Sequence, residues 1–141
     1  MELVRFDHSF SYHIEVDENI SAAEVGVPPM MIQPLVENAI WHGLMNKSGN
    51  RKLFIRYKLE DDRLICEIED NGIGIIQSSL RPRHGHQSFG IENIRHRLNL
   101  LNEKYHLNCS LQIKDKSEIS KDDSGTLAIL TLPVLNHYGA S

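Results

Sequence analysis

Apolar and polar residues alternate along three stretches of the chain, which cover residues 10–17, 53–59 and 64–68. A period of two predicts strands that bury one face. The four residues between the second and third stretches, 60–63, are Glu-Asp-Asp-Arg, and they predict a hairpin turn. The pattern therefore predicts one strand near the start of the chain and a β-hairpin further along.

The period changes to that of a helix in two other segments. From Met30 to about Leu44, just after two prolines, apolar residues recur every three or four positions and predict a helix with one buried side. A second helix is predicted to start near Gly90, because an apolar stripe runs from there to Tyr105.

The remaining segments complete the predicted fold. Leu111 and Ile113 predict a strand, and the consecutive apolar residues of 125–134 predict a strand in the interior of a sheet. Residues 75–89 are expected to form a loop, and residues 114–124, which are polar, a mobile turn. Because the strands come as hairpins rather than in regular alternation with helices, we expect an α+β fold, one sheet with helices on one face.

Length and composition narrow the class of protein. The chain has 141 residues, of which 40% are apolar, enough for one core but not for two. Its net charge of −4 argues against a basic surface for nucleic acid. Cys66 lies in an alternating strand pattern without CxxC spacing, which indicates a buried apolar residue and a reducing compartment. With no membrane-spanning run and no signal peptide, we expect a soluble, cytoplasmic domain.

Three polar residues, Glu37, Asn38 and His42, lie on the side of the first predicted helix that faces away from its apolar residues. A solvent-exposed helix surface would explain them. Asparagine, however, is a weak helix former, because its short side chain competes for backbone hydrogen bonds. A structural and a functional interpretation of these residues are therefore equally open at this point.

Residues 70–74, Asp-Asn-Gly-Ile-Gly, follow directly on a predicted strand and allow three interpretations. An EF-hand would need a glutamate at position 78, where the chain has serine. A dinucleotide-binding turn would need a third glycine at position 77, which is glutamine. A plain turn explains Asn-Gly but not the isoleucines that follow. A turn that is both glycine-rich and apolar suits the wall of a pocket for a flat ring, because glycine lets the backbone come close.

Two weaker signals follow further along the chain. Residues 88–91 lead from a loop into a helix, whose free backbone N–H groups suit an anion such as phosphate, although many helices start in this way. In the same loop, His84 and His86 lack the further ligands that a zinc site would need. Gly125 and Thr126, which open the last strand, are explained by the closure of a hairpin.

In their order and spacing, these features resemble the N, G1 and G2 boxes and the terminal Gly-Thr of the GHKL (Bergerat-fold) ATPases. The matching positions are Glu37, Asn38, His42, Asp70, Gly72, Gly74, Gly90, Gly125 and Thr126. Residues 28–43, Pro-Pro-Met-Met-Ile-Gln-Pro-Leu-Val-Glu-Asn-Ala-Ile-Trp-His-Gly, more closely resemble LytS-type sensor histidine kinases, and so do residues 10–17 and 90–98. The resemblance spans about residues 10–134. It implies a two-layer α/β sandwich with a mixed sheet and a flexible ATP lid at about residues 75–89.

The resemblance also implies an adenine pocket. Asp70 would accept a hydrogen bond from the exocyclic amine of adenine, and Thr126 would support Asp70. Gly72 and Gly74 would let the backbone pass close to the ring. A guanine would present a carbonyl oxygen to the buried carboxylate and leave it unpaired, so the site should prefer adenine.

For the triphosphate, the resemblance makes Asn38 a ligand of Mg²⁺, an ion that needs only one or two ligands from the protein. His42 would lie near the phosphates. Glu37 would be the catalytic residue that acts on or orients the attacking nucleophile. The phosphate oxygens would contact the start of the second helix, at Ser88, Phe89, Gly90 and Ile91.

As a whole, the resemblance implies the ATP-binding catalytic domain of a two-component sensor histidine kinase. Such a domain binds Mg-ATP and transfers the γ-phosphate to a histidine of an upstream dimerisation domain. The next partner is the receiver domain of a response regulator, and the parent protein is expected to be a membrane-anchored homodimer. The Pro-His-Phe motif of the phosphoacceptor is absent, and His8 and His13 are poor substitutes. We therefore expect ATP binding with little hydrolysis, and no nucleic-acid partner.

Two alternative functions share this fold. An anti-sigma-factor-type serine kinase is similar in length, but residues 33–38, Gln-Pro-Leu-Val-Glu-Asn, disfavour it. A nucleotide-binding interaction module without catalysis is also conceivable, and the presence of all the core site residues argues against it.

Overall fold

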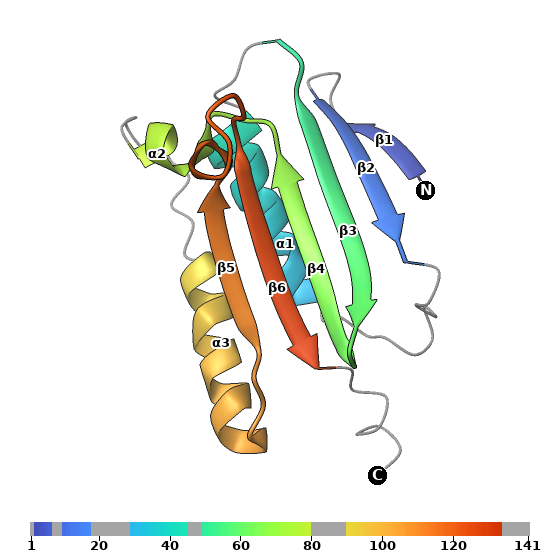
Figure 1. Ribbon diagram of the computed structural model, residues 1–141, viewed down its shortest axis with the longest axis vertical. Helices are drawn as coiled ribbons and strands as arrows, with labels where there is room; N and C mark the ends of the chain where they lie inside the picture. Colours follow the sequence, from blue (N-terminus) through green and yellow to red (C-terminus); the bar gives the residue numbers. More distant parts are fainter. Residues whose placement is uncertain (1, 7–9, 18–28, 45–48, 80–89, 134–141) are drawn as a thin grey trace.

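The computed structural model describes residues 2–6, 10–17, 29–44, 49–79 and 90–133 (Figure 1). Within these residues, six strands form one mixed sheet in the order β1-β2-β3-β4-β6-β5, and β2 and β3 are its parallel pair. The strands are β1 Glu2–Phe6, β2 Phe10–Val16, β3 Lys52–Glu60, β4 Arg63–Asp70, β5 Ser110–Asp115 and β6 Thr126–Pro133. The α+β prediction is confirmed.

The helices pack as a second layer against this sheet (Figure 1). Helix α1, Pro29–Asn38, continues without a break into a π-helical segment, η1, Ala39–Gly43. Helix α3, Gly90–Tyr105, packs beside α1. Two short elements complete the fold, α2 at Gly74–Ser79 and a 3₁₀ helix, η3, at Lys116–Glu118. No helix in the described ranges is long and apolar enough to cross a membrane.

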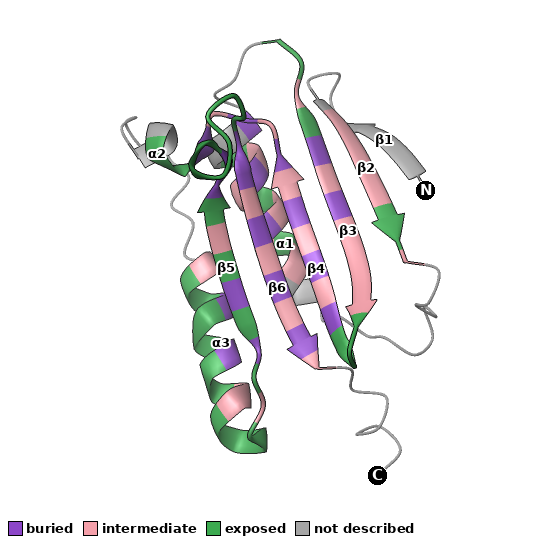
Figure 2. Ribbon diagram, in the orientation of Figure 1, coloured by how far each residue is buried: buried purple, intermediate pink, exposed green. Residues whose placement is uncertain are grey.

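The core lies between the sheet and the two long helices. Buried and less buried residues alternate along β4 and β6, as the period of two predicts (Figure 2). Cys66 is 1% exposed and packs in this core, which confirms its interpretation as a buried apolar residue. The helices contribute Leu35, Ala39, Ile94 and Leu98, and the strands Leu53, Ile55, Cys66, Ile68, Leu111, Ala128, Leu130 and Leu132.

Two helical features of the structure differ from the sequence-based predictions. The predicted helix 30–44 is present, but its last turn is a π-helix, which inserts one residue per turn and re-aims the side chains that follow. Residues 75–79 were predicted as part of a loop and instead belong to α2. The rest of the predicted lid, residues 80–89, lies outside the described residues.

The prediction of a mobile polar turn at 114–124 is wrong at its start. Lys114 and Asp115 are the last residues of β5, and Lys116 opens η3. Asp115 is 2% exposed and Lys116 is 9% exposed. Polar residues usually indicate exposure, but here ionic and hydrogen-bonding partners from distant segments compensate the burial. Strand β1, residues 2–6, was not predicted at all.

Candidate functional site

Three strands, segment η1 and helix α2 meet at one end of the sheet (Figure 1). Asp70 is the last residue of β4, Asp115 the last of β5 and Thr126 the first of β6. Segment η1 contacts both β4 and α2. Residues 70–74, called the glycine turn below, connect β4 to α2 at this place. The fold therefore brings the predicted helix residues and the predicted glycine turn to the same end of the molecule.

Asp70 has one carboxylate oxygen that is satisfied and one that is not. The backbone N–H of Gly72 donates to Oδ1 at 2.8 Å, and the backbone N–H of Thr126 also donates to this carboxylate. Oδ2 is buried and has no hydrogen-bond partner among the described residues. An unpaired buried acceptor costs free energy. A ligand that donates a hydrogen bond to Oδ2 would therefore be favoured.

Burial also changes the acidity of Asp70. The side chain is 1% exposed, and desolvation raises its pKa from 3.8 to about 6. The two backbone N–H groups and the ammonium of Lys116 act in the opposite direction. At neutral pH the carboxylate is ionised, so it can only accept hydrogen bonds.

This raised pKa predicts a pH-dependent stability. Because the folded-state pKa lies above the unfolded value, the contribution of Asp70 to stability is present below about pH 4 and is lost as the pH rises through 6. Asp70→Asn removes this titration. The unfolding free energy of the variant minus that of wild type should therefore increase by up to about 3 kcal/mol from pH 4 to pH 7. Urea denaturation at both pH values measures it; a difference that does not change with pH would contradict the prediction.

The glycines around Asp70 permit close backbone contacts. Gly74 has φ +87°, and a Cβ there would lie 2.6 Å from Oδ2 of Asp115. Gly125 has φ +115°, and a Cβ there would lie 1.9 Å from the backbone oxygen of Asp70. Gly72 is buried. The turn thus packs against the connection between β5 and β6 so closely that side chains are excluded.

The polar residues of the first helix stand at its C-terminal end. Glu37 is exposed and accepts a hydrogen bond from Nε2 of Gln33 at 3.1 Å. Asn38 is half-buried at the junction of α1 and η1. The backbone of His42 lies in η1, and its side chain lies outside the described part of the chain. A π-helical turn at this junction is a feature that often accompanies functional sites.

The start of α3 lies against the same helix. A Cβ on Gly90 would be 2.6 Å from the Cβ of Pro34, so glycine lets the N-terminus of α3 approach α1. Ile91 is half-buried and packs against the core. The other predicted phosphate contacts, Ser88 and Phe89, lie outside the described residues.

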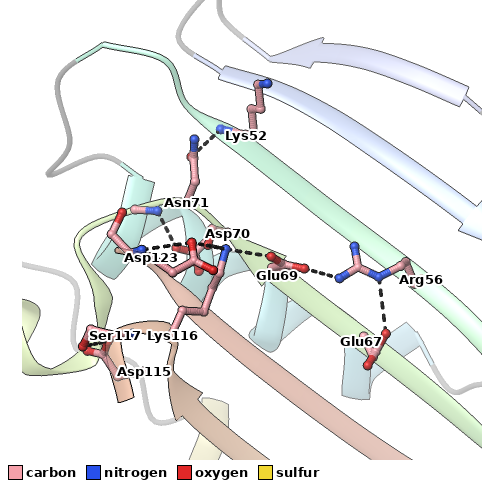
Figure 3. A network of polar contacts seen from close by, with 12 residues as sticks. Lys52, Arg56, Glu67, Glu69, Asp70, Asn71, Asp115, Lys116, Ser117 and Asp123 are labelled. Atoms are coloured by element: carbon pink, nitrogen blue, oxygen red, sulfur yellow. Dashed lines mark hydrogen bonds and ion pairs between the residues drawn. The ribbon is translucent and has the colours of Figure 1, made fainter. Parts of the chain in front are cut away.

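Sequence reasoning missed a set of charged residues beside Asp70 (Figure 3). Arg56 forms ion pairs with Glu67 and Glu69, and Lys116 pairs with Glu69 at 2.6 Å and with Asp123 at 3.5 Å. The pairs join β3, β4 and the β5–β6 connection. Polar alternation in β3 and β4 indicated an outward face, but nothing in the sequence indicated which charges meet there.

Comparison with curated proteins relates the chain to sensor kinases. No family model matches it. The sensor protein LytS of Staphylococcus saprophyticus is 30% identical over 143 residues, which cover 96% of this chain and 22% of that protein. The sensor protein kinase HptS of Staphylococcus aureus is 33% identical over 136 residues, 93% of this chain and 24% of that protein. The chain spans 12% to 36% of the length of the curated relatives it matches.

Two solved structures that share this fold are histidine kinases. The mycobacterial sensor histidine kinase MprB has a TM-score of 0.57 at 15% identity, covering 86% of this chain and 82% of that one. The histidine kinase domain of the Erythrobacter litoralis EL346 blue-light activated kinase has a TM-score of 0.56 at 17% identity, covering 87% and 55%. At such identities the likeness establishes the fold alone. With the sequence relationship added, the chain is similar to one segment of the LytS-type sensor histidine kinases, and it has the fold of the catalytic domain of histidine kinases.

Proposed function

We propose that this domain binds Mg-ATP and transfers its γ-phosphate to a histidine in a separate dimerisation domain of the same parent protein. The observation that carries the proposal is the buried Oδ2 of Asp70, an acceptor without a partner in the described structure. The exocyclic amine of adenine is a donor of the right kind. A guanine would place a carbonyl oxygen there, and the two acceptors would repel each other.

The other predicted contacts would lie along the nucleotide, at increasing distance from Asp70. Gly72 and Gly74 would pass beside the base, and Thr126 holds Asp70 through its backbone N–H. Asn38, at the end of α1, would supply an oxygen to Mg²⁺. The triphosphate would extend toward the N-terminus of α3, with His42, Ser88, Phe89, Gly90 and Ile91 as its contacts.

Bound Mg²⁺ would offset the negative charge that develops during phosphoryl transfer. Glu37 would orient the attacking imidazole or accept its proton, and its exposed position leaves it accessible to a second domain. The receiver domain of a response regulator would then take the phosphate. The relatives are much longer sensor proteins, which supports a parent with further domains, expected to be a membrane-anchored homodimer.

In the full-length parent, Glu37→Gln should lower autophosphorylation at least about 100-fold while ATP affinity stays within about twofold, because only the group that acts on the nucleophile is changed. Incorporation of labelled γ-phosphate measures the first quantity, and calorimetry the second. Glu92→Gln, an exposed residue of α3, is the matched control. Normal autophosphorylation of Glu37→Gln would exclude Glu37 as the catalytic residue.

A further inference from the structure

Two consecutive residues, the last of β5 and the first of η3, hold both ends of the glycine turn. Resting on the proposed function, we infer that Asp115 and Lys116 are positioning residues for the adenine-binding carboxylate. Lys116 fixes the Asp70 end of the turn (Figure 3). Asp115 fixes the Gly74 end, where the predicted lid starts.

Lys116 occupies a buried position, which is rare for a lysine. Its side chain is only 11% exposed, and its ammonium contacts Oε2 of Glu69 at 2.6 Å and the backbone oxygen of Asp70 at 3.4 Å. Asp123 lies at 3.5 Å, and Glu69 is also paired with Arg56. A buried ammonium is tolerated only when such partners compensate its desolvation. The backbone N–H of Lys116 donates to the oxygen of Gly125 at 2.9 Å, which fixes the main chain as well.

Asp115 makes an equally specific set of contacts at the other end of the turn. Oδ2 accepts a hydrogen bond from the backbone N–H of Ile76 at 3.0 Å. Oδ1 accepts from the backbone N–H of Ser117 at 2.9 Å and from its hydroxyl at 2.6 Å. Because Gly74 has no Cβ, this carboxylate can approach the start of α2. Asp115 therefore sets where α2 begins.

The charges around Asp70 give Lys116 a second effect. The groups that act on the Asp70 carboxylate are the N–H groups of Gly72 and Thr126, the ammonium of Lys116 and the carboxylate of Glu69. Among these, Lys116 supplies the full positive charge that opposes desolvation and keeps the pKa of Asp70 from rising further. Removing that charge should weaken adenine binding most at mildly acidic pH.

We expect Lys116→Met to bind adenosine and ATP about tenfold more weakly at pH 7, roughly the effect of one lost charge-assisted contact. The midpoint of the pH profile should move to higher pH. Adenosine is the probe for that profile because it carries no phosphate that titrates in the same range. Lys114→Met, an exposed change two residues away on β5, is the control, and Lys116→Arg should restore most of the affinity. A merely structural role would lower the melting temperature without moving the midpoint, and that result would overturn the inference for Lys116.

Asp115 is tested by amide hydrogen exchange of the nucleotide-free chain. In Asp115→Ala, the amide of Ile76 should exchange at least about tenfold faster, while Asp122→Ala, an exposed loop change, should have no such effect. Unchanged protection of Ile76 would exclude the role of Asp115.

The two proposals can fail separately. If the wild-type chain binds no ATP, the proposed function is wrong. The positioning roles are then judged on the nucleotide-free protein, by the exchange of Ile76 and by carboxyl ¹³C titration of Asp70. In Lys116→Met this titration should occur above the wild-type pKa of about 6. An unchanged titration would exclude the electrostatic role of Lys116.

Discussion

Asp70→Asn should weaken ATP binding about 100-fold, the largest effect on affinity that we expect from a single side chain. The amide oxygen of asparagine can still accept the hydrogen bond from Gly72. Its amide nitrogen, however, would replace Oδ2, the buried acceptor that has no donor in the described structure. Two donors, this nitrogen and the exocyclic amine of adenine, would then face each other, and an unsatisfied buried pair costs about 3 kcal/mol.

Isothermal titration calorimetry with ATP and GTP, each with and without Mg²⁺, measures this loss. Wild type should bind ATP in preference to GTP, and the variant should lose that preference. Asp62→Asn replaces an exposed carboxylate in the turn between β3 and β4 and should bind ATP like wild type. Because Asp70→Asn should be at least as stable as wild type at pH 7, reduced binding could not be attributed to unfolding. Unchanged ATP affinity would refute the adenine pocket.

The same residue shows what a sequence can and cannot reveal about a site. Asp70 was identifiable because a strand of clear period two ends on it and a glycine-rich turn follows. The strands at 10–17, 53–59 and 64–68 were predicted for the same reason, since local alternation reflects one buried face. What the sequence could not show was that Oδ2 lacks a partner, because that depends on residues from β6 and from the β5–β6 connection.

Asp115 and Lys116 illustrate the opposite case. They stand in a polar stretch that predicted a mobile turn, yet both are buried. Three of their partners, Ile76, Glu69 and the backbone of Asp70, are 39 to 47 positions away, so no local pattern reports these contacts. The π-helical turn was hidden for a different reason: it is the last turn of the predicted helix, so almost no apolar residues follow whose period it could shift.

Gly125 was interpreted from the sequence as a glycine that closes a hairpin, and the structure gives it a stricter requirement. Its φ of +115° is strained for any other residue, and an added Cβ would lie 1.9 Å from the backbone oxygen of Asp70. A methyl group at this position must therefore displace the end of β4 from β6. We expect Gly125→Ala to lower the unfolding free energy by about 3 to 5 kcal/mol, which combines backbone strain with overpacking.

Gly49→Ala is the matched control, because Gly49 also has a positive φ, +89°, but a Cβ there would meet nothing within 4 Å. Its expected cost is about 1 kcal/mol, from backbone conformation alone. Urea denaturation of both variants separates the two causes, since the excess cost of Gly125→Ala measures the contact with Asp70. Equal costs would show that the backbone of Asp70 can move away freely. In that event the carboxylate would not be held in place by the β5–β6 connection, and the adenine pocket would have to form only when the nucleotide binds.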